Sequence, residues 1–509
     1  MVLSSLTISQ IICATLVPLV WALLHELLCS PLRHIPGPPL ARFTDLYRAF
    51  LTYRGGVELH FRRWHRVYGT AVRIGNNAVS INDPALIKDI YAFKDEWIKS
   101  DMYRPNDILT QGQRLPNLFN TPSKILHAKL SSPIRGFWSL NSILKMEPLI
   151  DETTSLLLCS LESRFADKDQ EFCMMDEWLT YYAWDTVANV SFGRAYGFLE
   201  RGEDVDNIIA ESTSGLKYFA FVSQVPGLDD WLDKNPVIRI GPKPFLNGFL
   251  KAVEVISEYK QRASYSEFRR GSTQHFLDKY SALKGTVDDA QITNWLMLNI
   301  IAGGDSTAGA MRSVIYHVAR NPQVQVKLVQ ELDKAGLDIP AQWGDIKSLP
   351  YLDAVVRESY RISPGLGLVL ERVVPEGGFE LPDGRSLPGG TKVGINPCVV
   401  TRDAELFGPD VETYRPERWL RESMEEEAQF QTRYRKMMQV TDFGFGAGTR
   451  VCLGKHLAKI ELYKLAATLY STFDLRLKSP QHEWKTFNAW FMYQTDMPMI
   501  ISKRAQRRS

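Results

Sequence analysis

The sequence predicts a mainly α-helical protein with small β-sheets, built around one large domain. Most long segments after residue 85 place apolar residues at the spacing of an amphipathic helix. Residues 71–83 alternate apolar and polar side chains on either side of a Gly-Asn-Asn turn, which predicts a β-hairpin. Residues 286–320 predict a single helix far longer than average, which we expect to cross the whole body.

The first predicted element is an uncharged apolar run. Residues 6–24 contain no charged side chain, and at about 1.5 Å per residue the run nearly spans a hydrocarbon core of about 30 Å. We predict a short lumenal end at residues 1–5 and one transmembrane helix at residues 6–28. A cleaved signal peptide is the alternative, but residues 1–5 carry no Lys or Arg and no small-residue cleavage site is evident.

Basic residues follow the apolar run and predict its orientation. Arg33, Arg42 and Arg48 lie after it, so the positive-inside rule places the body in the cytosol. Residues 29–40 contain the sequence HIPGPPL, whose prolines fix φ and remove backbone donors. We predict a stiff proline-rich hinge there, followed by the main domain at residues 41–509.

The long helix has clear ends. Thr286 and Asp289 fit a capping box at its start, and Asn321-Pro322 stops it.

Two adjacent glycines lie in the middle of this helix. Gly303 and Gly304 each lower the stability of the helix by about 1 kcal/mol relative to alanine. Either close packing of a neighbouring helix or room for a flat cofactor would offset this loss. Asp305 and Ser306 come next along the chain. An acid beside an alcohol predicts a proton-delivery pair.

Composition excludes some classes of function. The chain has 509 residues, 60 basic and 58 acidic, and a formal net charge of +2, which argues against nucleic-acid binding. Its six cysteines form no CxxC pair and no regular spacing, so we predict neither a disulfide framework nor a zinc site, and a reducing environment.

Only Cys452 has an unusual setting, within FGFGAGTRVCLGKHLAKIE. Nearby glycines permit a tight turn whose amides point at a thiolate. Arg450 could pair with a cofactor carboxylate, and Phe445 could shield the sulfur from water. A single cysteine cannot complete a zinc or iron–sulfur site, whereas a macrocycle that supplies four ligands removes this shortage.

The pattern Phe-Gly-x-Gly-x-Arg-x-Cys-x-Gly at residues 445–454 resembles the haem-binding signature of the cytochrome P450 (haem-thiolate) monooxygenases, with every defining position filled. The resemblance implies the cytochrome P450 fold and haem b, with Cys452 as the axial ligand of the iron. Phe445, Gly448 and Arg450 are then cofactor-binding residues. A buried structural cysteine is the alternative for this stretch taken alone.

Separate stretches support the resemblance. Glu358 and Arg361 stand three residues apart in YLDAVVRESYRISPG, a spacing that favours an ion pair on one helical face. The sequence Pro-Glu-Arg-Trp at residues 416–419 is similar to the family segment that supplies a second arginine, here Arg418. The resemblance implies a buried structural triad.

The resemblance also assigns the long helix. Residues 302–307 are similar to the oxygen-activation helix of the family, which makes Asp305 the acid and Ser306 the alcohol, where threonine is usual. Thr307 is a second candidate for the hydroxyl role.

Two further contacts to the haem propionates are implied. Arg372 occupies a place from which the family often contacts a propionate. His127 and Ser131 stand where a family helix carries Trp and Arg, so we expect His127 to donate to a propionate and the arginine's contact to be missing.

The resemblance implies a membrane-anchored fungal monooxygenase at the endoplasmic reticulum. We expect it to insert one oxygen atom of O2 into a hydrophobic small molecule in natural-product biosynthesis. The alternatives are a detoxifying or catabolic hydroxylase or demethylase of aromatic compounds, a haem-thiolate protein without reductase-driven turnover, and isomerisation or peroxide-dependent oxidation. The implied substrate walls are residues 103–118, 298–302, 364–370 and 491–495.

Electrons are expected from a partner. The chain has no phosphate-cradling glycine loop between a strand and a helix, so we expect NADPH to act through a separate diflavin reductase, with cytochrome b5 as a second candidate donor. Lys455, Lys459 and Lys464 either meet an acidic partner surface or form an ordinary solvated helical face.

Overall fold

A computed structural model describes residues 17, 20, 21, 24, 26, 28–91, 97–110, 112–168, 171–241, 246–262 and 274–504. The predicted lumenal end lies outside these residues, and so does most of the predicted span at residues 6–28. Within the described part of the chain, no helix combines the length and the apolar character that crossing a membrane requires.

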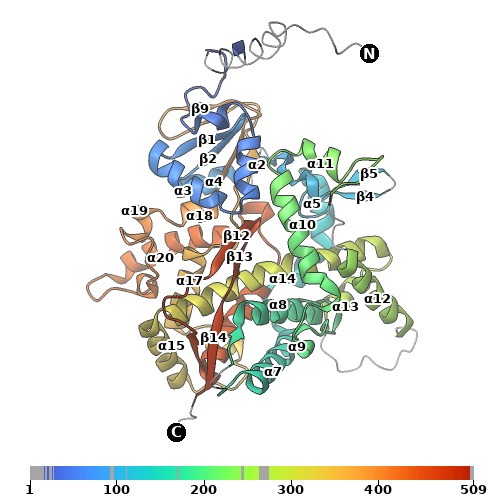
Figure 1. The fold of residues 1–509 in the computed structure, drawn as a ribbon, viewed down its shortest axis with the longest axis vertical. Helices are drawn as coiled ribbons and strands as arrows, with labels where there is room; N and C mark the ends of the chain where they lie inside the picture. Colours follow the sequence, from blue (N-terminus) through green and yellow to red (C-terminus); the bar gives the residue numbers. More distant parts are fainter. Residues whose placement is uncertain are drawn as a thin grey trace.

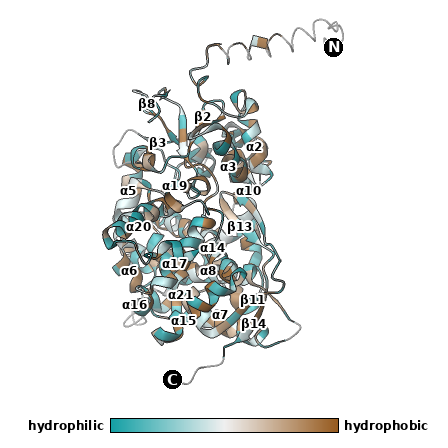
Figure 2. Cartoon of the chain, turned by 90° about the vertical axis from the view of Figure 1, so that its left-hand side faces the viewer, coloured by the Kyte–Doolittle hydropathy of each residue, from teal (hydrophilic) through white to brown (hydrophobic). Residues whose placement is uncertain are grey.

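The predicted fold class is confirmed: helices dominate and the sheets are small (Figure 1). The helices of eight or more residues are α2 (Leu46–Tyr53), α3 (Val57–Tyr68), α5 (Lys124–Arg135), α7 (Glu147–Arg164), α8 (Met175–Phe192), α10 (Ile208–Val222), α12 (Leu246–Arg262), α14 (Asp289–Arg320), α15 (Pro322–Ala335), α17 (Pro350–Ile362), α20 (Glu427–Asp442) and α21 (Lys455–Thr472). The shorter helices are α4 (Ile87–Ile90), α6 (Leu140–Leu144), α9 (Phe198–Arg201), α11 (Gly227–Leu232), α13 (Phe276–Ser281), α16 (Trp343–Ile346), α18 (Pro397–Val400) and α19 (Ala404–Phe407). Peripheral helices α15 and α20 are coloured mostly hydrophilic in Figure 2.

The largest sheet has five strands in the order β1-β2-β10-β7-β3, with β10 parallel to β2 and the other pairs antiparallel. The predicted hairpin is present, with its turn at Asn76 and Asn77 between β1 and β2. The strands of this sheet are β1 (Ala71–Gly75), β2 (Ala78–Ile81), β3 (Ile98–Lys99), β7 (Arg372–Val373) and β10 (Lys392–Ile395). The others are β4 (Ile108–Thr110), β5 (Gln113–Leu115), β6 (Cys173–Met174), β8 (Phe379–Glu380), β9 (Ser386–Leu387), β11 (Phe473–Leu477), β12 (Lys485–Ala489), β13 (Phe491–Thr495) and β14 (Pro498–Lys503).

The segment before α2 is fixed to this sheet. The carbonyl of Pro36 accepts a hydrogen bond from the amide of Arg73 at 2.8 Å, and a Cβ on Gly37 would overlap the carbonyl of Arg73. The guanidinium of Arg73, which is 1% exposed, is bound by the buried carboxylate of Glu26. The proline-rich segment is therefore packed against β1.

Helix α14 crosses the body, as the sequence predicts, and ends at Arg320 before Asn321-Pro322. The predicted start is wrong. The N-cap is Asp288, whose carboxylate accepts from the amide of Gln291 at 2.7 Å, whereas the hydroxyl of Thr286 bonds to the preceding turn at Leu283. The N-terminal and C-terminal halves of α14 belong to two different apolar clusters, so the helix joins both parts of the core.

The paired glycines bring α14 close to α8. A Cβ on Gly303 would lie 2.6 Å from Val187, and one on Gly304 would lie 2.5 Å from the ring of Trp184. Distances this short exclude any side chain at either position without a shift of α8. The structure therefore supports close helix packing, and not room for a cofactor, as the reason for the glycine pair.

This packing predicts the effect of a single methyl group. Gly304→Ala should lower the free energy of unfolding by about 1–3 kcal/mol, because overpacking against Trp184 outweighs the gain in helix propensity. Thermal unfolding followed by circular dichroism measures it. Gly215→Ala is the matched control, since nothing lies within 4 Å of its Cβ position in α10. The control should be neutral or stabilising, and equal effects of the two changes would contradict the packing explanation.

Candidate active site

The loop before α21 presents Cys452. Gly446 and Gly448 have φ of 76° and 64°, a left-handed conformation that glycine adopts without strain. These turns let the amide of Cys452 donate to the carbonyl of Phe445 at 2.8 Å. The Cys452 side chain is exposed, and it is the only one of the described cysteines placed in such a loop.

The environment of the thiol acts on its pKa in two directions. Desolvation by the surrounding protein raises the pKa of Cys452, while hydrogen bonds from the amides of Gly454 and Lys455 and the charge of Lys455 oppose that shift. Those amides are donors suited to a thiolate. The ring of Phe445 packs edge-on against Tyr360 at 5.5 Å between centroids.

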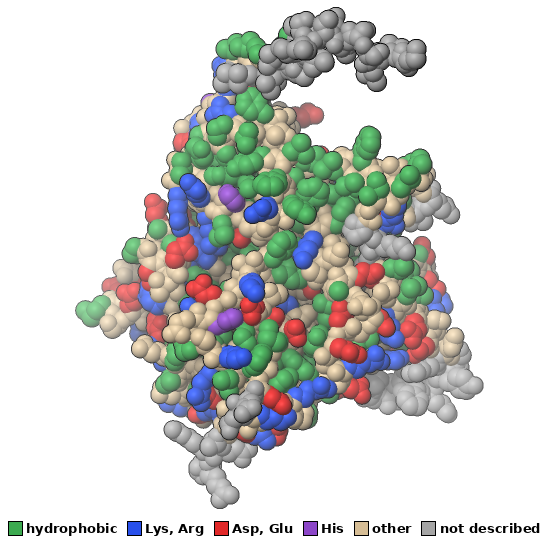
Figure 3. All heavy atoms as spheres, viewed as in Figure 1, with side chains coloured by type: hydrophobic (Ala, Val, Ile, Leu, Met, Phe, Trp, Pro, Cys, Tyr) green, Lys and Arg blue, Asp and Glu red, His purple; other side chains and the backbone are tan. Residues whose placement is uncertain are grey.

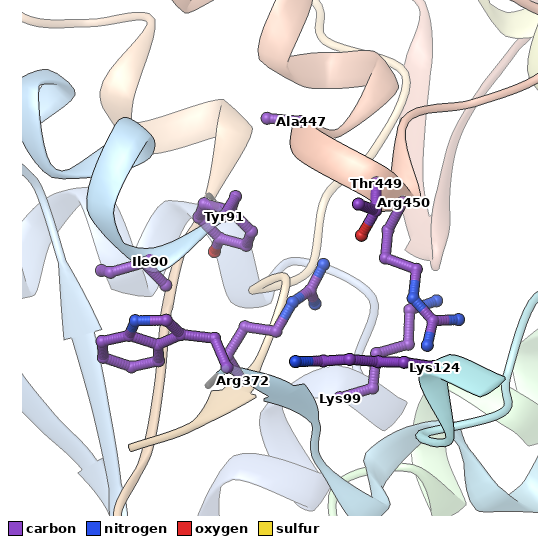
Figure 4. A pocket seen from close by; sticks show the side chains of 9 residues that line it. Ile90, Tyr91, Lys99, Lys124, Arg372, Ala447, Thr449 and Arg450 are labelled. Carbon is purple, nitrogen blue, oxygen red and sulfur yellow. The ribbon is translucent and has the colours of Figure 1, made fainter. Parts of the chain in front are cut away.

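Cationic side chains converge beside this loop, as Figure 4 shows. The pocket that they line is formed by Ile90, Tyr91, Trp97, Lys99, Lys124, Arg372, Ala447, Thr449 and Arg450. Arg372 donates to the carbonyl of Glu371 at 2.9 Å, and its guanidinium lies 4.9 Å from the centroid of Tyr91. The structure thus brings together Arg372 and Arg450, which the sequence predicts as cofactor-binding residues.

Arg372, Arg450 and Lys99 have no carboxylate partner among the described residues. Lys99 donates to the carbonyl of Phe119, and Arg450 points Nη2 at the carbonyls of Pro122 and Ser123 at 3.5 and 3.4 Å. Nη1 of Arg450 is buried without a hydrogen-bond partner in the described part of the chain. Such a set of donors is suited to carboxylate groups of a ligand.

Burial, and then repulsion between neighbouring cations, lowers the pKa values of Arg450 and Lys99. Burial and the charge of Arg372 lower the pKa of Arg450 to about 10. Burial, Arg372 and Arg450 lower the pKa of Lys99 well below its ordinary value. Lys99 was missed in the sequence, because a lone lysine in a short strand carries no motif.

His127 joins the same cluster from α5. Burial, followed by the charges of Arg450, Lys99 and Arg135, lowers the pKa of His127 to about 4, so the ring is neutral at pH 7. Ser131, one turn later, is buried and accepts from Arg135 at 3.4 Å. No arginine stands at position 131, and Lys99 and Lys124 supply positive charge in this region.

Asp305 and Ser306 direct their side chains to different partners. The carboxylate of Asp305 accepts from Nε1 of Trp184 at 3.2 Å, from Oγ of Ser212 at 2.8 Å and from Oη of Tyr493 at 2.8 Å. The hydroxyl of Ser306 donates to the carbonyl of Ala302, one turn back, at 2.6 Å. Asp305 and Ser306 are adjacent in the chain, but the carboxylate of Asp305 lies in a buried hydrogen-bond cluster that the hydroxyl of Ser306 does not join.

The other predicted residues of this helix segment differ in exposure. Thr307 is 5% exposed, whereas Ala302 is exposed and Ser306 is half-buried. Of the two candidate hydroxyls, Ser306 is therefore the more accessible.

An aromatic wall lies beside the cation cluster, since Nζ of Lys99 is 4.3 Å and 4.4 Å from the ring centroids of Tyr103 and Phe119. Trp490 lies edge-on to Tyr103, Phe119 and Phe219, with centroids 5.8, 5.6 and 5.3 Å apart. It takes a positive φ of 76° between β12 and β13. Trp490 thus joins two of the segments predicted to line the substrate site, 103–118 and 491–495. Trp490 itself was not predicted from the sequence.

Glu358, Arg361 and Arg418 form a buried ion cluster. Arg361 donates to both carboxylate oxygens of Glu358 at 2.8 Å, and Arg418 donates to one of them at 3.0 Å. The indole of Trp419 adds a bond at 2.9 Å. Burial opposes ionisation, but the two arginines hold the pKa of Glu358 below its usual value. Every oxygen of the carboxylate is satisfied, as expected of a structural group.

The prediction of an exposed lysine on α21 is wrong for Lys464, one of the three lysines. Lys464 is fully buried and pairs with Glu147 at 2.6 Å. Lys455 and Lys459 both pair with Asp442, at 2.7 and 3.4 Å. Lys455 and Lys459 thus share one carboxylate, and a partner surface at these two half-buried lysines stays a prediction.

The ion cluster yields a prediction about stability. Glu358→Gln removes the one carboxylate recorded for the buried Arg361 among the described residues and leaves Arg418 with Asp410 alone. It should lower the free energy of unfolding by about 3–5 kcal/mol. Urea unfolding measures it. Glu171→Gln is the control, because Glu171 makes an exposed pair with Lys168 at the same three-residue spacing, and stability should not change. A fully stable Glu358→Gln variant would contradict the structural role.

Comparisons with known proteins agree with this geometry. The cytochrome P450 family model matches residues 36–501. The cytochrome P450 monooxygenase mpaDE of Penicillium roqueforti is 36% identical over 484 residues, which are 93% of this chain and 56% of the relative. The cytochrome P450 monooxygenase cfoH of Aspergillus candidus is 34% identical over 93% of this chain and 89% of its own, and cicH of Emericella nidulans is 34% identical over 91% and 92%. The chain thus spans about half the length of mpaDE and most of the other two.

Proposed function

Because the chain belongs to the cytochrome P450 family, we propose that it is a haem-thiolate monooxygenase that inserts one oxygen atom of O2 into a hydrophobic small molecule. The observation that carries the proposal is Cys452, exposed in a loop whose amides face its thiol, beside Arg372, Arg450 and Lys99, for which the described residues supply no carboxylate partner. A thiol, an open cation cluster and an aromatic wall together fit an apolar iron macrocycle with two carboxylates.

Each part of the donor set has a role in this proposal. Cys452 would hold the iron, and the amides of Gly454 and Lys455 would stabilise its thiolate. Arg372, Arg450 and His127 would bind the two carboxylates, with Lys99 beside them. Bound haem supplies the activation of dioxygen, which the protein's own side chains cannot perform.

The chain itself orients the substrate and moves protons. Trp490 and its aromatic neighbours would bury an apolar substrate, largely by excluding water. Ser306 would hold a proton at its accessible hydroxyl, next to the exposed Ala302. We propose a fungal natural product as substrate, since the curated relatives are fungal monooxygenases.

We also propose that the protein is anchored in the endoplasmic reticulum membrane by the part of residues 6–28 that precedes Glu26, with its body in the cytosol. Glu26 itself is bound to Arg73 of β1. The absence of charge in residues 6–24 supports the anchor. Hydrophobic side chains gather on the face seen in Figure 3, where Figure 1 places α2 and α11. On these two helices, Phe50 of α2 is 55% exposed and Trp231 of α11 is 77% exposed. A membrane-bound diflavin reductase, with or without cytochrome b5, would then supply electrons from NADPH.

The thiolate assignment predicts a spectrum. Membrane-expressed protein, reduced and treated with carbon monoxide, should show the red-shifted Soret band of thiolate ligation, and Cys452→Ser should abolish it because the iron loses its sulfur ligand. Cys159→Ser is the control, since Cys159 is also exposed but lies on α7. A normal band in the Cys452→Ser variant would overturn the assignment.

The reaction predicts an isotope pattern. With NADPH, a diflavin reductase and 18O2, product from a panel of apolar fungal metabolites should carry one 18O atom, as mass spectrometry would show. The control omits the reductase while NADPH and 18O2 are kept. Product without label, or labelled product formed at the same rate without the reductase, would rule out reductase-driven oxygen insertion.

A further inference from the structure

A second pocket opens on the surface where α2, α10 and β12 adjoin (Figure 1). Its cavity has a volume of about 190 Å³, and it shares no lining residue with the pocket of Arg372 and Arg450. Aromatic rings and one cation make up most of its lining, which consists of Thr52, Tyr53, Lys217, Tyr218, Phe221 and Phe487. None of these six residues is acidic. The pocket is therefore a separate site with its own chemistry.

The aromatic rings of this pocket are held in place by their contacts. The ring of Phe221 lies edge-on to Tyr53, with centroids 5.8 Å apart. The ring of Phe487 packs so closely on Gly55 that a Cβ there would lie 2.2 Å from it. The amide of Asn488 donates to the carbonyl of Gly55 at 2.7 Å, which fixes β12 to the turn after α2. A ligand would thus meet rings that are already ordered, and ordered groups lose less entropy on binding.

Lys217 supplies the charge of the pocket. Its side chain is exposed, and its ammonium lies 4.9 Å from the centroid of the Phe487 ring. Within the described ranges, Lys217 forms no ion pair with a carboxylate. The hydroxyl of Tyr218 is engaged inside the protein, since it donates to the carboxylate of Asp229 at 2.9 Å. An ammonium carries three donors, so Lys217 can bind an anion next to the rings.

The chemistry of the lining defines the ligand. Edge-on rings pack well against a flat aromatic group, and the ammonium forms a charge-assisted hydrogen bond with an acid. The cavity is smaller than the about 300–1,000 Å³ of pockets that enclose a drug-sized molecule, so it suits one or two fused rings. An anionic lipid offers the same charge, but burial of its hydrated headgroup against rings would cost free energy.

We propose that this pocket is a binding site for a small aromatic carboxylate. The ring of the ligand lies against Tyr53, Phe221 and Phe487, and its carboxylate pairs with Lys217. Because the pocket is separate from the cysteine loop, the site does not depend on the proposed monooxygenase function.

The test measures ligand affinity by fluorine NMR, with the full-length protein in phosphatidylcholine nanodiscs. The probes are a monofluorinated naphthoate and the matching naphthalenemethanol, which has the same rings without the charge. Lys217→Met should weaken binding of the naphthoate about three- to fivefold, as expected for a partly exposed ion pair, and leave the alcohol unchanged. Lys217→Arg should restore the wild-type affinity for the naphthoate.

Phe487→Leu tests the aromatic part of the site. Loss of the ring should weaken binding of both probes, because both present the same naphthalene to it. Lys478→Met is the matched control, since the ammonium of Lys478 also lies over a phenylalanine ring, that of Phe172 at 3.7 Å, but Lys478 does not line this pocket. Its affinity for both probes should equal that of the wild type.

Two outcomes would overturn the site. One is equal affinity of the wild type and Lys217→Met for the naphthoate. The other is displacement of the naphthoate by phosphatidylserine added to the nanodiscs, which would assign the pocket to a lipid headgroup. A carbon monoxide spectrum of the same preparation tests the proposed function separately: a missing thiolate band would refute that function, while the affinities still decide the pocket.

Discussion

The contact between α14 and α8 is the constraint on which the site depends. Trp184 packs its ring on Gly304 and donates its indole N–H to Asp305, the next residue. One side chain thus fixes both the separation of the two helices and the direction of the acid. Ser212 and Tyr493 attach α10 and β13 to the same carboxylate. The elements around the long helix are therefore positioned relative to one buried group.

Two clusters of buried charge differ in how they are balanced. Glu358 is surrounded by donors that satisfy both of its oxygens, so its cluster is closed and stabilises the fold. The carboxylate of Glu371, which precedes Arg372, is bound by Arg48 and Ser100 and does not neutralise the cations beside it. Among the residues that the structure describes, no carboxylate pairs with Arg372, Arg450 or Lys99. The Glu358 cluster therefore stabilises the fold, whereas the cations around Arg372 are suited to binding a ligand.

Motifs with fixed local geometry could be predicted from the sequence. The cysteine loop, the hairpin turn and the pairing of Glu358 with Arg361 are set by residues close in the chain, where spacing determines contact. The partners of Asp305 could not be predicted, because Ser212 and Tyr493 are far from it in sequence and belong to no motif. Lys464 shows the same limit: its spacing on a helix resembles a solvated face, and only tertiary packing against Glu147 reveals that it is buried. The glycine pair in the sequence indicated that either another helix or a ligand lies close to the long helix. It could not show which of the two is the close neighbour.

The buried ion pair of Glu26 and Arg73 bears on how the body stands relative to a bilayer. A proline-rich linker alone would leave the orientation of a domain to linker length and thermal rotation. Here the chain is joined to the five-stranded sheet before the prolines begin, by a carboxylate that Arg73 binds from β1. For a chain anchored by the residues that precede Glu26, the anchor and the sheet would tilt together. The height and angle of the body above the lipid would then be a property of the fold itself.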